Sequence, residues 1–120
     1  MRAEVVGAIL VPLLLGAVIS CAPKRPANPL ASDDPSVKIP AMKHAAAAHD
    51  RSAIPQLITD LDNDDPAIRM YAIEALRHLT GQDMGYRYYD DEAARAPAVQ
   101  RWKQWPKARA ATTKAGDKLG

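Results

Sequence analysis

The sequence contains one cysteine, Cys21, and no phenylalanine among its 120 residues. A single cysteine excludes an internal disulfide, so the fold must depend on its apolar core. The lack of phenylalanine, together with abundant alanine, favours helices over strands. The formal net charge of only +2 argues against nucleic acid as the main partner. No apolar run reaches the roughly 20 residues that a membrane-spanning helix needs.

The longest apolar run covers residues 5–19 and is broken by Pro12. Signal peptides have an apolar core of roughly 7–15 residues, whereas a spanning helix is longer. The run therefore predicts a signal peptide over residues 1–20. The alternative is an uncleaved anchor helix, which would be short for a bilayer.

A cysteine follows this run directly, in the order Val18, Ile19, Ser20 and Cys21. This segment resembles the lipobox of bacterial lipoproteins. The resemblance implies that the Cys21 thiol receives a lipid, that the chain is cut before Cys21, and that the new amine is acylated. This covalent lipid is the only non-protein group expected. Ala22, which stands where an aspartate would retain the protein at the inner membrane, implies outer-membrane sorting, facing the periplasm, in a Gram-negative cell.

Composition divides the rest of the chain into three parts. Residues 21–33 hold the lipidated cysteine and a proline-rich tether. One small helical domain is expected over residues 34–106. The final segment, 107–120, is basic and is predicted to be disordered, because Pro106 ends the last helix.

An Asp-Pro motif occurs twice, 31 residues apart, at Asp34-Pro35 and at Asp65 with Pro66. Aspartate is a favoured helix N-cap, and proline is favoured at the first helical position. A shorter third echo occurs at residues 97–100. Each full copy therefore predicts the start of a helix within an internal repeat.

The spacing of apolar residues predicts about four helices. They lie at about 36–49, 51–62, 66–80 and 91–106. Gly81 is expected to end the third helix in a left-handed conformation. Trp102 and Trp105 share a face of the fourth helix, which Pro97 either starts or kinks.

The central segment resembles a HEAT-like repeat of the phycobilisome-lyase type. The matching stretches are DRSAIPQLI (50–58), LDNDDPAIR (61–69) and AIEAL (72–76). The resemblance implies an all-α fold, a short HEAT-like α-solenoid fragment closed by a tryptophan-bearing capping helix. It also implies that Arg69 bridges to the turn carboxylates of Asp62 or Asp64. Members of this family mostly serve as protein-binding scaffolds, and a minority handle tetrapyrroles.

Metal and catalytic sites find little support in the sequence. The four aspartates at 60, 62, 64 and 65 lack the glycine and glutamate of an EF-hand, so we interpret them as a solvated turn with an N-cap. The three histidines do not pair at the helical metal-site spacing. No nucleophile or phosphate-binding motif is recognisable. We therefore expect neither catalytic residues nor metal ligands, and no enzyme activity.

The most unusual local cluster consists of Tyr86, Arg87, Tyr88 and Tyr89. Tyrosine and arginine are enriched in binding hot spots, but the same residues can pack a capping segment onto a core. Both interpretations remain open. The function expected is that of a membrane-anchored envelope scaffold that binds an unknown envelope protein. The alternative is a carrier or chaperone for an apolar or tetrapyrrole-like small molecule in a helix groove.

Overall fold

The computed structural model describes residues 28–116, which form helices and contain no strand. The α-helices are α1 (Pro35–Ala47), α2 (Ile54–Asp60), α3 (Pro66–Thr80) and α4 (Glu92–Gly116). Two short 3-10 helices, η1 (Pro29–Ala31) and η2 (Arg51–Ala53), precede α1 and α2. The predicted all-α class is therefore confirmed for this part of the chain.

The two Asp-Pro motifs begin α1 and α3 in the same way. The Asp34 carboxylate accepts a 2.8 Å hydrogen bond from the backbone N–H of Ser36. The Asp65 carboxylate likewise accepts a 2.8 Å hydrogen bond from the backbone N–H of Ala67. These bonds satisfy N–H groups that have no partner within the first turn of a helix. The third echo, at 97–100, lies inside α4 and starts no helix.

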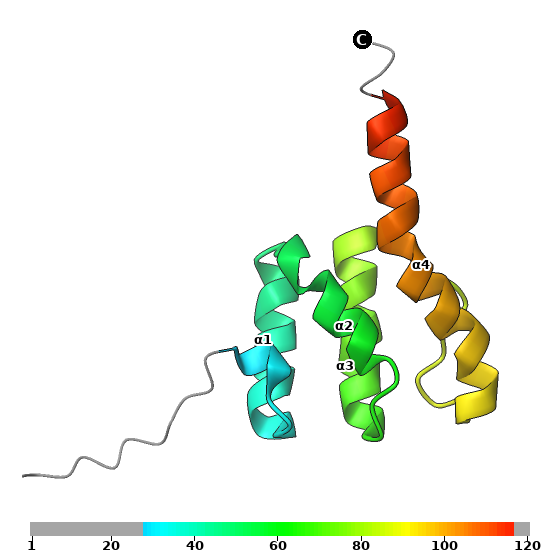
Figure 1. Ribbon diagram of the computed structural model, residues 1–120. Helices are drawn as coiled ribbons and strands as arrows, with labels where there is room; N and C mark the ends of the chain where they lie inside the picture. Colours follow the sequence, from blue (N-terminus) through cyan, green and yellow to red (C-terminus); the bar gives the residue numbers. More distant parts are fainter. Residues whose placement is uncertain (1–27, 117–120) are drawn as a thin grey trace, which may run out of the picture.

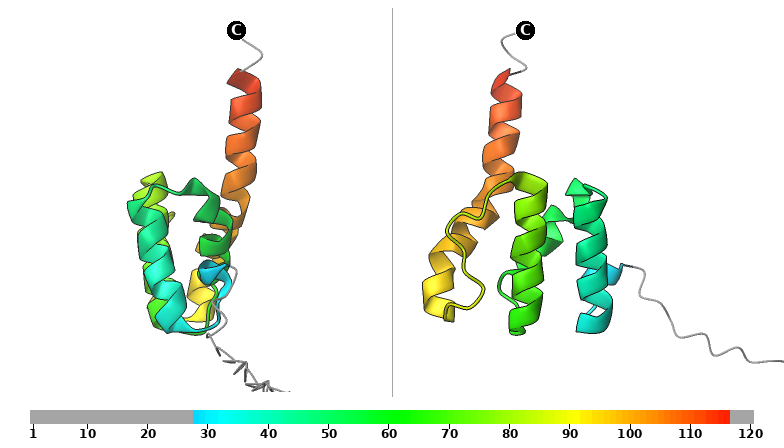
Figure 2. Two further views of the ribbon diagram at one scale, coloured as in Figure 1. Left: turned by 90° about the vertical axis from the view of Figure 1, so that its left-hand side faces the viewer. Right: turned by 180° about the vertical axis from the view of Figure 1, so that it is seen from behind.

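The helices α1, α3 and α4 point in the same direction, and their N-terminal ends lie at one end of the molecule (Figure 1). The short helix α2 runs the opposite way. It packs against α3 and contacts α4, while α1 packs mainly against α3 (Figure 2). The long loop between α3 and α4 brings the chain back, so that α4 can start at the same end as α3.

One apolar core joins all four helices. Its largest fully buried side chains are Trp102, Met42, Leu57, Leu61, Ile68, Leu76 and Val99. From α2, Ile54, Leu57 and Ile58 face this core, and the tryptophan face of α4 supplies Trp102. Trp105 is only partly buried beside it. Burial of these side chains is the main stabilising contribution in a domain of this size.

The segment 28–33, which we expected to be part of the tether, is partly folded. Asn28 caps η1 by accepting a hydrogen bond from Leu30 N–H at 3.1 Å. The Leu30 side chain packs against the core, and η1 contacts both α1 and α2. Residues that the sequence placed in a linker therefore pack against α1 and α2. A single leucine is too weak a pattern to predict this.

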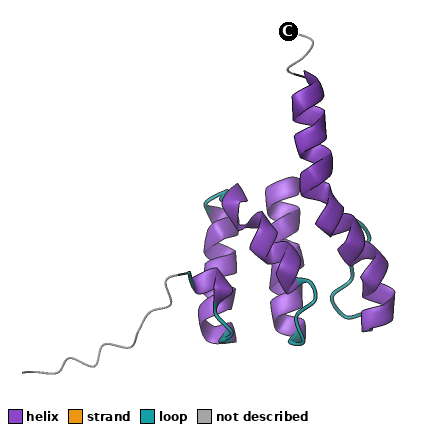
Figure 3. Ribbon diagram, viewed as in Figure 1, coloured by secondary structure: helices purple, strands orange, loops and turns teal. Residues whose placement is uncertain are grey.

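The helix α4 does not end at Pro106, and residues 107–116 are not disordered as predicted. The helix continues through both Pro97 and Pro106 to Gly116 (Figure 3). Each proline removes one backbone hydrogen bond and clashes with the preceding turn. The surrounding alanine, lysine, arginine and glutamine residues favour the helix strongly enough to continue it. None of the helices within residues 28–116 has the length and apolar character needed to cross a bilayer.

A buried ion pair joins α1 to α2. The Nζ atom of Lys38 lies 2.6 Å from Oδ1 of Asp60, and both side chains are almost fully buried. Gln56 donates a longer bond, 3.3 Å, to the same oxygen. The expectation that all four turn aspartates are solvated is therefore wrong for Asp60, since the burial of a carboxylate requires such a counter-ion.

Candidate functional site

The loop of residues 81–91 between α3 and α4 carries the predicted contact cluster. Its backbone carbonyls accept hydrogen bonds from side chains of the flanking helices. Trp102 donates to Asp83 at 3.1 Å, and Arg101 donates twice to Met84, at 2.8 and 3.1 Å. These bonds hold the first half of the loop against α4. The loop therefore has a fixed shape although it contains no regular secondary structure.

Two buried arginines hold the second half of the loop. Arg69 of α3 donates from Nε to the carbonyl of Tyr88 at 3.0 Å, and Arg95 of α4 donates to Asp90 at 2.6 Å. Both side chains are more than nine-tenths buried. The positions of Tyr88 and Asp90 are thus set by the two helices between which the loop lies.

The expected bridge from Arg69 to the carboxylates of Asp62 or Asp64 is not formed. Arg69 instead donates to the backbone carbonyls of Asn63, at 2.7 Å, and Asp64, at 2.8 Å. The guanidinium therefore joins the α2–α3 turn to the Tyr88 carbonyl through three main-chain oxygens. Main-chain acceptors are available because a turn leaves its carbonyls without helical partners.

Tyr86 is a packing residue. It is only 4% exposed, and its hydroxyl donates a 2.6 Å hydrogen bond to the carbonyl of Leu61. Burial raises the pKa of the Tyr86 phenol above its ordinary value, while the Arg95 and Arg69 cations act in the opposite direction. This residue anchors the loop to the end of α2 and is not available to a partner.

Of the other three members of the cluster, Arg87 and Tyr89 are exposed, whereas Tyr88 is half-buried and packs against the apolar core. Tyr89 is 66% exposed and is the most exposed large apolar side chain among the described residues. Its ring packs edge-on against Tyr88 at a centroid distance of 5.3 Å. Arg87 is exposed, and its Nε atom lies 3.9 Å from Oδ2 of Asp90. The structure therefore divides the predicted cluster into one anchor, Tyr86, and a surface formed by Arg87, Tyr88 and Tyr89, here called the tyrosine surface.

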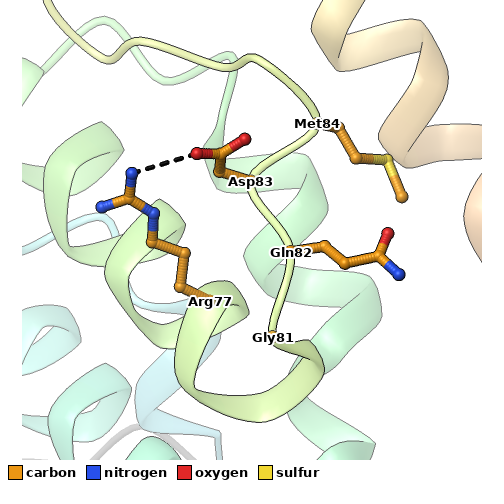
Figure 4. Close-up of a pocket in the computed structure, with 5 residues that line it drawn as sticks. All are labelled: Arg77, Gly81, Gln82, Asp83 and Met84. Carbon is orange, nitrogen blue, oxygen red and sulfur yellow. Dashed lines mark hydrogen bonds and ion pairs between the residues drawn. The ribbon is translucent and has the colours of Figure 1, made fainter.

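A hollow of about 520 Å³ lies where α3 ends and the loop begins (Figure 4). It is lined by Arg77, Gly81, Gln82, Asp83 and Met84. Arg77 is already bound to Asp83 at 3.1 Å, and Gly81 takes the left-handed conformation predicted for it (φ 73°). The N–H of Gly85, and next the Arg77 guanidinium, hold the pKa of Asp83 below its ordinary value. The two charged side chains of this lining pair with each other, which does not suit an apolar ligand.

A second hollow, about 310 Å³ in volume, lies in the groove between α1 and α3. Its lining residues are Met42, Lys43, Ala46, Tyr71, Glu74, Ala75 and His78. Lys43 lies over the Tyr71 ring, 5.3 Å from its centroid. This volume is at the lower end of the about 300–1,000 Å³ typical of small-molecule sites. A carrier that binds a small molecule between two helices of the described part of the chain could use this groove.

Two histidines meet at the opposite end of the molecule from the tyrosine surface. The rings of His49 and His78 stack with centroids 5.0 Å apart. Stacked faces do not direct two ring nitrogens toward one ion. Within residues 28–116 there is also no group of three or more histidine, cysteine, aspartate or glutamate side chains placed to hold a metal.

Two of the side chains that fix the loop, Arg95 and Arg101, are not predicted by the sequence to bind it. A weak signal existed for Arg95, which stands seven residues before Trp102 and so lies on the same helical face. No such signal marks Arg101, because its acceptor is a loop carbonyl 17 residues away. Backbone acceptors leave no trace in the side-chain pattern.

Comparison with known proteins gives no match among family profiles, curated proteins or solved structures. The resemblances to a lipobox and to a HEAT-like repeat therefore stay predictions from the sequence. The lipobox residues Val18, Ile19, Ser20 and Cys21 lie outside the described residues.

Proposed function

We propose that this chain is a lipid-anchored lipoprotein of the bacterial envelope whose helical domain serves as a protein-interaction or assembly scaffold. The lipid would be attached to Cys21, and the tyrosine surface would contact an envelope protein. The observation that carries the proposal is the exposure of Tyr89 on a loop whose backbone is fixed by buried side chains.

Rigidity is the reason why this surface favours binding over simple packing. A partner that binds a fixed loop does not have to order it, so less of the interaction energy is lost. Tyr89 presents a large, stiff ring, the half-buried Tyr88 packs edge-on against it, and Arg87 adds an exposed charged donor. Tyr86 and Arg69 hold this surface from below. The arrangement resembles an interface anchor with its supporting residues.

A photo-crosslinking amino acid at position 89, in the full chain in its native envelope, would test the proposal. We expect one discrete protein adduct. The same probe at Ala47, an exposed position at the end of α1, is the matched control and should give no such adduct. Equal, diffuse labelling from both positions would contradict the proposal.

Side-chain replacements would then establish whether the tyrosine itself matters. Tyr89→Ala should weaken binding of the captured partner by about thirtyfold, as expected for a hot-spot residue, while Tyr89→Phe should retain most of it. Neither change should alter the melting temperature, because Tyr89 is mostly exposed. Undiminished binding by Tyr89→Ala would remove the tyrosine surface from the proposal.

A further inference from the structure

The charges of the described chain are segregated along the sequence. Residues 101–116 carry five cationic side chains and no acidic one. Residues 28–100 carry seven cationic and twelve acidic side chains, a formal charge of −5. The second half of α4 therefore carries a net positive charge, whereas the rest of the described chain carries a net negative one.

The last ten residues of α4, 107–116, are called the arm here. All of them are exposed, and they extend beyond the other helices (Figures 1 and 2). At 1.5 Å per residue the arm is about 15 Å long. At 100° per residue, Lys107 and Lys114 fall on the same face of α4 as Lys103, within about 40° of one another. Arg109 lies over the Trp105 ring, 5.4 Å from its centroid, at the base of the arm.

The side chains of the arm indicate what kind of surface it can bind. Apart from its three cations, the arm consists of alanine, threonine and one glycine. Protein interfaces are normally centred on large apolar or aromatic anchors, and the arm has none. Helices that insert into a bilayer also need such side chains on one face. Adsorption to anionic headgroups, in contrast, requires only clustered cations.

We propose that the arm lies against anionic phospholipid headgroups of the membrane that carries the protein. The attraction is electrostatic and involves no insertion. This inference rests on the membrane anchoring in the proposed function and adds a second, reversible contact to it. The acidic remainder of the domain, with its charge of −5, would be repelled by the same surface. The two effects together would orient the domain on the membrane.

Hydrogen–deuterium exchange on the full chain, reconstituted into vesicles, would test the inference. One set of vesicles contains phosphatidylcholine alone, and the other contains about a third phosphatidylglycerol. We expect the amides of 107–116 to exchange about tenfold more slowly on the anionic vesicles. Raising the ionic strength to 1 M, where the screening length is about 3 Å, should abolish the difference.

Two variants with the same number of neutralised cations sharpen the test. Lys107→Gln/Lys114→Gln should lose most of the protection on anionic vesicles. Lys43→Gln/Arg87→Gln, which neutralises two exposed cations of the acidic part, should retain it. Because each variant is compared between the two vesicle types, a change in the intrinsic stability of the arm cancels out.

Three results would overturn the inference. Equal exchange on both vesicle types would show that the arm does not contact lipid, while the anchoring proposal would stand. Protection that depends on protein density and not on lipid charge would assign the arm to a protein contact. Failure of the full chain to associate with either vesicle type would instead contradict the anchoring proposal, and this inference with it.

Discussion

The ammonium of Lys38 lies 2.6 Å from Oδ1 of Asp60, and the two side chains are only 5% and 3% exposed. The second carboxylate oxygen of Asp60 is buried without a hydrogen-bond partner. A charge pair held in this way joins two helices, but its removal from water is costly. Loss of one partner should therefore be far more harmful than loss of both.

Replacement of Lys38 is the first prediction. Lys38→Met leaves the Asp60 carboxylate buried without its counter-ion and should lower the free energy of unfolding by about 3–5 kcal/mol. Lys38→Met/Asp60→Leu should recover most of this loss, because no charge then remains buried. Urea unfolding measures both. A double variant no more stable than the single one would contradict this account.

The second prediction concerns Trp102 and our hypothesis that α4 caps the domain. Trp102→Ala removes a fully buried indole and its 3.1 Å bond to Asp83, and should cost about 3–5 kcal/mol, enough to unfold a small domain or make it self-associate. Removal of residues 107–120 is the control. The described part of that segment is exposed, so we expect no change in stability. A cooperatively melting, monomeric Trp102→Ala protein would exclude the capping role.

Replacement of Arg69 is the third prediction. Arg69→Ala removes three donors from buried or half-buried carbonyls and should lower stability by about 3 kcal/mol. Arg69→Lys should recover only part of this, since an ammonium cannot reproduce the planar fork of a guanidinium. Arg87→Ala, at an exposed position nearby, is the control. An unchanged urea midpoint for Arg69→Ala would remove Arg69 from the structural account.

The fourth prediction concerns alkaline pH. Burial holds the pKa of Tyr86 above its ordinary value of about 10, so the folded state retains the phenol proton longer than the unfolded chain does. The contribution of the protonated Tyr86 phenol to the free energy of unfolding is complete below pH 10. It is lost as the pH rises through the folded-state pKa. Unfolding followed against pH should accordingly show a loss above pH 10. Tyr86→Phe, although less stable at pH 7, should lack this part of the pH dependence, and an identical pH profile would contradict the assignment.

Lipidation of Cys21 is the fifth prediction. Mass spectrometry of the N-terminal peptide from bacterial membranes should find Cys21 as the first residue, carrying acyl chains. Cys21→Ser should accumulate as an uncleaved precursor without lipid mass. An intact Met1 and a free thiol in the wild-type protein would show that residues 18–21 are not a lipobox.

Local signals in the sequence predicted much of the fold. Asp34, Asp65 and Gly81 lie at the helix ends that their chemistry predicts, because caps depend on interactions within one turn. The end of α4 was predicted wrongly. Proline at position 106 predicts a helix end, yet one lost backbone hydrogen bond does not outweigh the helix-favouring residues on either side.

The candidate site could be predicted only as a cluster of residue types. Four neighbouring residues suggested a contact surface, but Tyr86 is buried and Tyr89 is exposed. Side chains of adjacent loop residues do not alternate or repeat in a fixed pattern, as they do in a strand or a helix. The direction of each side chain therefore depends on which points of the loop backbone are bound to the rest of the protein. In this loop, those points are set by Arg69 of α3 and Trp102 of α4, which donate hydrogen bonds to loop carbonyls.

The sequence by itself determined the helical class and the starts of α1 and α3, because capping and apolar spacing act over a few residues. Only the tertiary structure decided the partners of the buried charges. The Lys38–Asp60 pair spans 22 residues, and Arg69 bonds to carbonyls where carboxylates were expected. Such contacts arise when packing brings distant segments together, and a buried charge then takes the nearest acceptor that packing provides.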